Sequence, residues 1–533
     1  MRVTNSMINR NNIYNINNNK FSVDKMFSQM SSQKKIQNAS DDPVIAIRAL
    51  RLRTTLSEIN QYYEKNIPDA ESWLEVTEGA INNIKNLLKD AKTKCEYGAN
   101  NTLNQENRKA LLDELKQMKN QIYSEMNTDE AGRTVFSGYK TNKTVSLTKD
   151  DKDMDYTITE KLSYQDIGEK KYYANLMDVS DNIPDGNGGL NPAPTADQML
   201  QEKTCNRLRL SYGQMENGNN SLDSFSYSYK EGNEEYRISY KKEANGDFKK
   251  IEEKKKADGK YETLSEENPT TKVAERSYEQ WQKDGFELKQ NEEVVYIKET
   301  GELIFSEDAR KELYSKKADL QVTYDKKGFE KGDVRPEMYF DCTDKNAGLS
   351  YEKQRQDIEY TVAFNQTLTV NTQPEDVVDA GVGRDIEDLE EAVQLSIDAH
   401  DKYDKIKDMM GQERYSSKEN QEKLQGWLEA AKKECDYADE NMKNVFSKNI
   451  GIFDDHFKKA TLAQTEIGAK GDSLDLTKNR MLGQQETYKE LKSKNEDRDI
   501  SDVILDYTSA YFAYQASLQA AGKANQTSLL NYI

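Results

Sequence analysis

Apolar residues recur every three or four positions near both ends of the chain, the spacing of helices that pack along a seam. Near the N-terminus the row, interrupted by one lysine, is Ile13, Ile16, Val23, Phe27 and Met30. Near the C-terminus it is Ile500, Ile504, Tyr507, Tyr511, Tyr514, Leu518 and Ala521. Neither helix can bury its row alone. The rows therefore predict that the terminal helices pack on each other and then on neighbouring copies, with an ordinary intramolecular helix pair as the alternative.

Longer rows of the same spacing lie inside these terminal segments. They run from Ala70 to Cys95, from Leu111 to Met126 and from Leu424 to Ile452, and a fourth places Ile467, Leu474, Met481 and Tyr488 at seven-residue intervals. The stretch from Gly98 to Asn104 is expected to be a loop between the first two. Four or more long helices drawn from both ends of the chain predict an elongated bundle.

The middle of the chain has the two-residue alternation of half-buried strands. Phe225-Tyr227-Tyr229 and Tyr236-Ile238-Tyr240 alternate with polar residues, and Asn245-Gly246 follows as a turn signal. Val294 to Ile297 and Leu303 to Phe305 flank Thr300-Gly301 as a predicted hairpin. The sequence thus predicts a mainly α fold with a β-rich insertion: an elongated helical bundle formed by the N- and C-terminal segments, and a central β-rich projecting domain.

This interpretation divides the chain into five segments. The predicted division is 1–40, an N-terminal polymerisation helix; 41–145, the N-terminal half of a helical stem; 146–375, a β-rich variable insertion; 376–495, the C-terminal half of the stem; and 496–533, a C-terminal polymerisation helix. Pro374 is the last proline, so the strongest helix breaker is missing from everything that follows it.

The net charge and the composition of the chain make some classes of binding partner unfavourable. A formal net charge of -19 makes nucleic acid or an anionic membrane surface an unfavourable partner. No apolar run is long enough for membrane insertion, and the N-terminal residues lack the apolar core of a secretory signal peptide. The four cysteines lie far apart without the spacing of a metal finger or redox motif, and are expected to be single buried thiols.

Motifs for catalysis are missing from the sequence. There are two histidines, His400 and His456, and no H-E-x-x-H, G-x-S-x-G, P-loop or G-x-G-x-x-G. With 95 acidic residues, any general acid–base pair chosen from the sequence would be chance. We therefore expect no enzyme activity, no cofactor and no metal. His456 is expected to be a packed histidine, and the tyrosines of the middle segment to be sheet packing, with glycan binding as the alternative.

Two segments carry recognisable motifs: residues 31–43 read SSQKKIQNASDDP, and residues 132–141 read GRTVFSGYKT. They resemble the SSGxRIxxxxDDP loop and the GRYLFxGxxT turn of the hook–filament junction proteins within the flagellin superfamily. The matched motif residues are Asp41, Asp42, Pro43, Gly132, Arg133 and Phe136. Gln33 stands where the family has glycine, which makes a turn with positive φ less comfortable. Pro68 falls where the family helix continues, and predicts a kink or a helix restart.

The resemblance implies a structural subunit of the bacterial flagellum that joins hook to filament. It implies neighbours that are copies of the chain and the adjoining hook and filament junction proteins. It also implies flagellar type III export without cleavage and a cytoplasmic export chaperone at the C-terminal helices. The alternatives are a filament-forming flagellin or a flagellum-anchored adhesin or enzyme that works through the insertion. Asp41 and Asp42 are expected to cap a helix that opens at Pro43, rather than to hold a metal.

Overall fold

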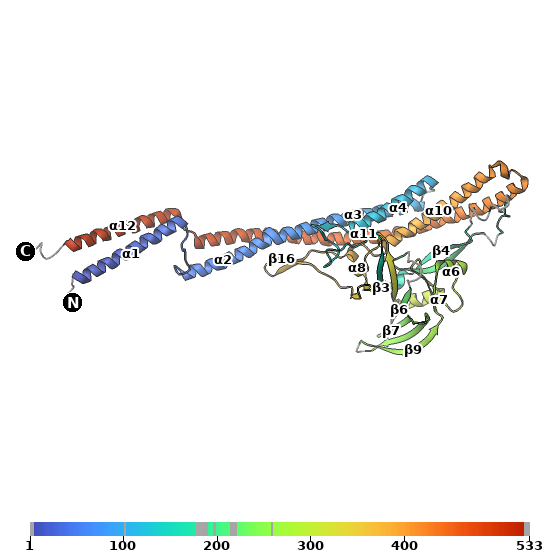
Figure 1. Cartoon of the computed structure of the whole chain (residues 1–533), viewed down its shortest axis with the longest axis horizontal. Helices are drawn as coiled ribbons and strands as arrows, with labels where there is room; N and C mark the ends of the chain where they lie inside the picture. The colour runs from blue at the N-terminus through green and yellow to red at the C-terminus, as the bar shows by residue number, and fades with distance from the viewer. Residues whose placement is uncertain are drawn as a thin grey trace, which may run out of the picture. The chain divides into compact units, whose positions relative to one another are not determined.

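The computed structural model describes residues 5–100, 103–176, 179, 183, 190–195, 199–213, 221–256 and 259–526. The chain forms two compact units, whose elements are labelled in Figure 1. The terminal unit comprises Met1–Glu71, Glu359–Thr369 and Lys470–Ile533, and the central unit comprises Ser72–Ile358 and Val370–Ala469. The prediction of long helices at both ends and a β-rich middle is confirmed.

The terminal unit consists of paired helices and one hairpin. Helix α1 (Asn5–Ser32) packs against α12 (Ile500–Gln526), and α2 (Pro43–Gln61) packs against the last part of α11 (Lys418–Glu496). Strands β16 (Glu359–Ala363) and β17 (Gln366–Thr369) form the hairpin. The ring of Phe364 at its tip meets Tyr62 edge-on at 5.4 Å, and Gln366 donates to the Thr477 hydroxyl at 3.2 Å.

A π-helical turn, η1 (Tyr62–Asn66), joins α2 to α3 (Ile67–Asn100) directly before Pro68. Proline has no N–H and its ring collides with the carbonyl four residues earlier in a regular helix. A wider turn, with the Ile67 N–H bonded to the Tyr62 carbonyl, lets the helix continue past Pro68. The predicted disturbance at Pro68 is therefore a local widening of a continuing helix.

In the central unit α3 and α11 are joined by α4 (Gln105–Glu125) and α10 (Val382–Met410), and α4 packs against α10. The predicted loop at Gly98 to Asn104 is wrong in its first part, because α3 continues to Asn100. A Cβ added to Gly98 would lie 2.2 Å from the ring of the buried Phe446. Glycine here permits close helix packing instead of ending the helix. Asn104 caps α4 by accepting from the Asn107 N–H at 2.8 Å.

Two larger sheets make up the β-rich part. The eight-stranded sheet has the order β15-β14-β3-β13-β6-β7-β8-β9, and its paired neighbours run antiparallel. Its strands are β3 (Asp151–Ser163), β6 (Leu222–Glu231), β7 (Glu234–Lys242), β8 (Phe248–Lys255), β9 (Tyr261–Thr270), β13 (Asp319–Phe329), β14 (Asp341–Asp344) and β15 (Leu349–Tyr351). The predicted strands around Phe225 and Tyr240 are confirmed as β6 and β7, and Asn245-Gly246 lies in the turn to β8.

The five-stranded sheet has the order β10-β11-β12-β5-β4. Its strands are β4 (Gly168–Ala174), β5 (Gln201–Arg209), β10 (Val273–Arg276), β11 (Val294–Ile297) and β12 (Glu302–Phe305). The predicted β11–β12 hairpin is confirmed. Short elements complete the unit: β1 (Asp129–Glu130), β2 (Arg133–Thr134), α6 (Tyr278–Lys283), α7 (Glu307–Lys316), α8 (Pro336–Tyr339), α9 (Pro374–Val377), η2 (Tyr164–Asp166) and η4 (Glu413–Tyr415).

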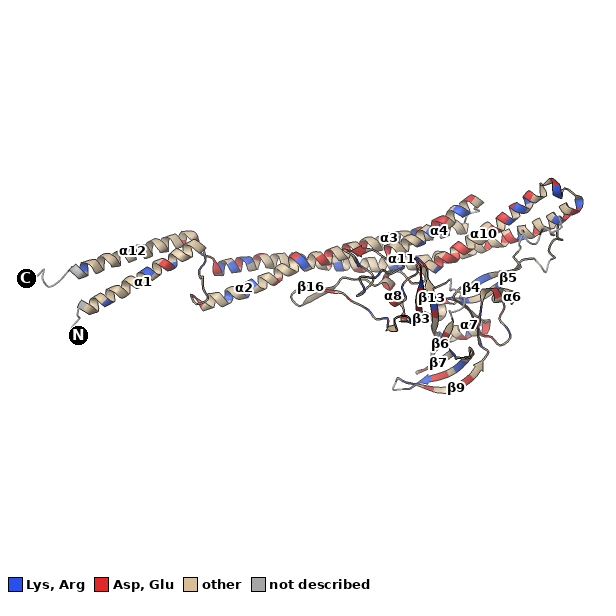
Figure 2. Cartoon of the chain, in the orientation of Figure 1, with Lys and Arg blue, Asp and Glu red and all other residues tan. Residues whose placement is uncertain are grey.

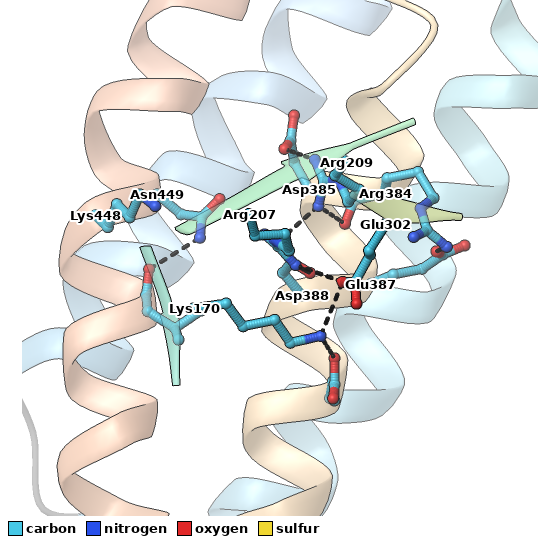
Figure 3. Close-up of polar contacts among 12 residues, drawn as sticks. Lys170, Arg207, Arg209, Glu302, Arg384, Asp385, Glu387, Asp388, Lys448 and Asn449 are labelled. Carbon is cyan, nitrogen blue, oxygen red and sulfur yellow. Dashed lines mark hydrogen bonds and ion pairs between the residues drawn. The ribbon is translucent and has the colours of Figure 1, made fainter. Parts of the chain in front are cut away.

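A buried ionic network joins the five-stranded sheet to α10 (Figure 3). Arg207 bridges Asp388 and Glu302 at 2.7 and 2.9 Å, and Lys170 approaches Glu302 at 3.0 Å. Burial alone would raise the pKa of Asp388 and Glu302, but the surrounding cations outweigh burial and hold both pKa values well below their usual range. Removal of one partner from such a network leaves an uncompensated buried charge, so the network fixes the sheet on α10.

Candidate polymerisation interface

The facing sides of α1 and α12 mix apolar side chains with small and polar ones. On each helix a row of half-buried or buried residues with three- and four-residue spacing forms the contact. These rows are Asn12, Ile16, Asn19, Val23, Met26 and Met30 on α1, and Val503, Tyr507, Ala510, Tyr514, Ser517 and Ala521 on α12. Asn19 donates to the Ala513 carbonyl at 3.3 Å, and the Phe27 and Tyr507 rings lie 6.1 Å apart. Two of the six α1 residues are asparagine and three of the six α12 residues are alanine or serine, so the contact buries less apolar surface than a seam of large side chains would.

Other large apolar side chains of these helices face outward. Exposed residues at seven-residue spacing are Met7, Tyr14 and Phe21 on α1, and Ile504, Tyr511 and Leu518, with Leu505 and Phe512, on α12. Ile13, Lys20 and Phe27 are also exposed, and Phe27 lies at the border of the contact, where its ring meets Tyr507. Phe21 is 72% exposed and Leu505 69%, so their apolar surface has no partner within the described chain. Exposed apolar rows at heptad spacing are what a helix presents to a further helix.

The predicted row at each end divides between two faces. Ile16, Val23, Met30, Tyr507, Tyr514 and Ala521 lie on the α1–α12 contact, whereas Ile13, Phe27, Ile500, Ile504, Tyr511 and Leu518 are exposed. A three- or four-residue spacing predicts one stripe, but both helices are apolar over a wider arc. Met7, Tyr14, Phe21, Leu505 and Phe512 were missed for the same reason, and their own seven-residue spacing was the available signal.

The loop between α1 and α2 uses each aspartate of the motif differently. The Asp42 side chain caps α2 by accepting from the Val44 and Ile45 N–H groups at 3.0 and 3.1 Å, with Pro43 at the first helical position. Asp41 accepts from the Gln37 and Asn38 N–H groups at 3.0 and 2.9 Å. These backbone hydrogen bonds lower the pKa of Asp41. The predicted helix cap is confirmed for Asp42, whereas Asp41 holds the loop before it.

The same loop is bonded to the junction of α11 and α12. The Lys35 N–H donates to the Glu496 carbonyl at 2.8 Å, and the Arg498 N–H donates to the Gln33 carbonyl at 3.0 Å. Gln33 has a φ of 55°, the left-handed turn for which glycine would be more favourable. Arg53 holds the buried Glu496 carboxylate through bonds of 2.7 and 2.6 Å. The loop between α1 and α2 and the junction of α11 and α12 are thus held together by one set of hydrogen bonds.

The other motif residues lie in the central unit and stabilise a turn after α4. Gly132 has a φ of 80°, the Arg133 guanidinium lies 5.0 Å from the Trp73 ring centre, and Phe136 is buried. This cation–π contact and buried ring are structural contacts within the central unit. They are separate from the α1–α12 surface.

The histidine and cysteine side chains of the described residues have structural surroundings. The described residues contain no group of three His, Cys, Asp or Glu placed to hold a metal ion. All four cysteines are buried and unpaired, as predicted. Burial disfavours the charged form of His456, but hydrogen bonds to Asp379 and Asp385 outweigh it and raise its pKa to about 9. His456 is thus a packed, ion-paired histidine. None of the helices in the described ranges is both long and apolar enough to cross a bilayer.

Comparison with known proteins finds similarity to flagellar proteins over part of the chain. Residues 3–141 match the model of the bacterial flagellin N-terminal helical region. Flagellar hook-associated protein 3 of Salmonella typhimurium and that of Escherichia coli are each 30% identical over 142 residues, which are 26% of this chain and 44% of the relative. A flagellin of Clostridium tyrobutyricum is 27% identical over 130 residues, 24% of this chain and 34% of the relative.

The matches therefore span less than half the length of these relatives. Solved structures include FlgL of Xanthomonas campestris (TM-score 0.29, 10% identity, 83% of this chain and 99% of that one) and hook-associated protein 3 of Legionella pneumophila (0.28, 10%, 83% and 97%). These findings agree with the resemblance found in the sequence: residues 3–141 match the bacterial flagellin N-terminal helical region, and the chain is similar to flagellar hook-associated protein 3 over 142 residues.

Proposed function

We propose that this chain is a structural, non-catalytic subunit of the bacterial flagellum that joins the hook to the filament. The observation that carries the proposal is the outward rows of large apolar side chains on α1 and α12, together with the match of residues 3–141. Rows such as Ile504–Tyr511–Leu518 are suited to bury apolar surface against helices of neighbouring copies and of adjoining hook and filament junction proteins.

The predicted division of the chain belongs to this proposal. Segments 1–40 and 496–533 act as polymerisation helices, 41–145 and 376–495 as the helical stem, and 146–375 as an insertion that polymer contacts do not need. Export through the flagellar type III apparatus, with a cytoplasmic chaperone on the C-terminal helices, fits a chain whose terminal apolar rows require cover before assembly.

A deletion strain tests the proposal. Electron microscopy should show hooks without filaments, and flagellin should appear as monomer in the medium. Complementation with the full chain should restore filaments. Intact filaments and normal swimming would contradict a junction role. Loss of filament subunits without shed flagellin would instead support the filament-forming alternative, for which the Clostridium tyrobutyricum flagellin is the relevant similarity.

A further inference from the structure

Helix α2 carries exposed apolar residues of its own, separate from the rows of α1 and α12. They are Val44, Ile47 and Leu50, which follow one another at three-residue intervals near the start of the helix. All three are exposed, Leu50 at 68%. Neighbouring apolar side chains that stay exposed on one helix mark a contact with a further chain.

Two arginines give this part of α2 a positive charge. Arg48 and Arg51 are exposed beside the apolar residues, and among the described residues neither has a carboxylate within ion-pair distance. Arg53, in contrast, is paired with Glu496. The one acidic residue of α2 is Glu58, about two turns beyond Arg51. We call the apolar and basic surface of these five residues the α2 patch: Val44, Ile47, Arg48, Leu50 and Arg51.

Helix α11 has the complementary chemistry in the part that belongs to the terminal unit. Leu476 is 73% exposed, although its neighbours Leu474 and Thr477 are buried. Asp472 and Asp475 lie within about one turn of Leu476, and both are exposed. Neither forms an ion pair with any residue that the structure describes. These three residues form the α11 patch, which is apolar at its centre and acidic beside it: Asp472, Asp475 and Leu476.

The two patches are complementary in charge. Each combines exposed apolar side chains with two charges that have no partner in the described chain, and the charges have opposite signs. Figure 2 shows α1 and α12 mostly tan, whereas charged residues are frequent on α11. Opposite charges across an interface select the partner and fix its register. A second copy of the chain thus offers each patch a matching surface.

The two patches of one chain cannot meet each other. Asn495 of α11 donates to the Ile45 carbonyl at 3.2 Å, so the start of α2 lies beside the end of α11. At 1.5 Å per residue, Leu476 lies about 28 Å along the helix from Asn495. A contact between the α2 patch and the α11 patch therefore joins two copies head to tail. It leaves one patch of each copy for the next neighbour, the arrangement that builds rings and filaments.

We propose that the α2 patch of one copy docks on the α11 patch of the next, with Ile47 and Leu50 against Leu476 and the two arginines opposite the two aspartates. The inference rests on the proposed function and specifies a contact between neighbouring copies. Apolar burial on the α1 and α12 rows has no direction of its own. The charges of the two patches determine which face of one copy meets which face of the next.

Cysteine cross-linking in assembled flagella tests the contact. The full chain with both Ile47→Cys and Leu476→Cys is expressed in the deletion strain, and its flagella are oxidised and separated without reductant. A ladder of cross-linked chains should appear, because each copy links to two neighbours through different residues. Either substitution alone should give no cross-link. The four native cysteines are buried, so they add no background.

Charge reversal tests the pairing of the patches. Arg48→Glu with Arg51→Glu should lower the amount of chain in flagella roughly tenfold or more, because like charges then face each other. Asp472→Arg with Asp475→Arg should do the same. The chain with all four substitutions restores opposite charges and should be incorporated as the unchanged chain is. This rescue is the matched control, since it carries every substitution of the two defective variants.

The outcomes separate this inference from the proposed function. Normal incorporation without a ladder, or a chain with four substitutions that is as defective as the double variants, would overturn the inference and leave the junction role in place. A cross-link through Leu476→Cys alone would show that like patches meet, and would overturn it as well. Intact filaments in the deletion strain would contradict the proposed function itself, and the inference would fall with it.

Discussion

Replacement of Tyr511 and Leu518 by aspartate tests whether the outward row of α12 drives assembly. These residues are 41% and 44% exposed in the isolated chain. Full burial of a large apolar side chain contributes about 1.5–3 kcal/mol, so the exposed part of each offers about 0.6–1.3 kcal/mol to an assembled contact. Loss of both removes about 1–2.5 kcal/mol, or roughly five- to sixtyfold in affinity at 1.4 kcal/mol per factor of ten.

Aspartate adds a second, larger penalty. Burying an unpaired carboxylate in a helix contact costs several kcal/mol more, so the double variant should not be incorporated at a detectable level. The soluble chain should keep its stability to within about 0.5 kcal/mol, because both positions are exposed there. Export is measured separately, as the amount of the variant found in the medium.

The assay is immunogold electron microscopy of flagella from a deletion strain that expresses the variant. The matched control is Ala513→Asp with Ala520→Asp, two exposed positions seven residues apart, each two residues after a residue of the tested row and therefore on the opposite side of α12. It should be incorporated normally. Normal incorporation of the Tyr511 and Leu518 variant would refute the assignment of this row, and equal loss in the control would show that any added charge on α12 blocks assembly.

Four further predictions concern stability and reactivity. Asp42→Ala should lower the free energy of unfolding by about 1 kcal/mol, measured by thermal denaturation, because it removes the cap of α2. The pKa of His456 is raised from 6.5 to about 9, so its contribution to the free energy of unfolding is fully present below pH 6.5 and is lost as the pH rises to 9. Guanidinium titrations should therefore show the free energy of unfolding falling by up to about 3 kcal/mol across this range. The His456→Gln variant should lack this fall. Gly98→Ala should cost about 1–3 kcal/mol, and a double-mutant cycle with Phe446→Leu should recover most of it. The four cysteine thiols, whose pKa values burial raises to about 11 or 12, should resist iodoacetamide until the chain is unfolded, as mass spectrometry can show.

The long helices and the hairpins could be predicted because their signals are local. Asn245-Gly246 and Thr300-Gly301 mark turns by residue type alone, and both turns occur where expected. Helix α10 could have been predicted in the same way from a row of apolar residues with helical spacing, all of them buried: Ile386, Leu389, Val393 and Ile397. In contrast, α6 and α7 are six and ten residues long, too short for a helical period to stand out within a β-rich segment.

The ionic network and the Gly98 contact could not be predicted, for a different reason. Arg207 meets Asp388 across 181 residues of sequence, and nothing near either residue distinguishes it from the many other charged side chains. Gly98 predicts a helix end because glycine is a poor helix former. In the structure it is needed within the helix, where the ring of Phe446 approaches the backbone. Both depend on which elements meet, and that is a tertiary property.

The way the apolar residues of α12 divide between its two faces matters more for its function than how many of them there are. A helix pair selected for stability on its own would bury its largest side chains in its seam. Here the α12 side of the seam holds Ala510 and Ser517 beside Tyr507 and Tyr514, while Leu505 and Phe512 face outward at 69% and 63% exposure. The α1–α12 pair therefore leaves apolar surface of α12 uncovered, which further helices can bury. A subunit with this arrangement stays a weakly held pair until its neighbours arrive, and the burial that orders its ends is the same burial that drives assembly.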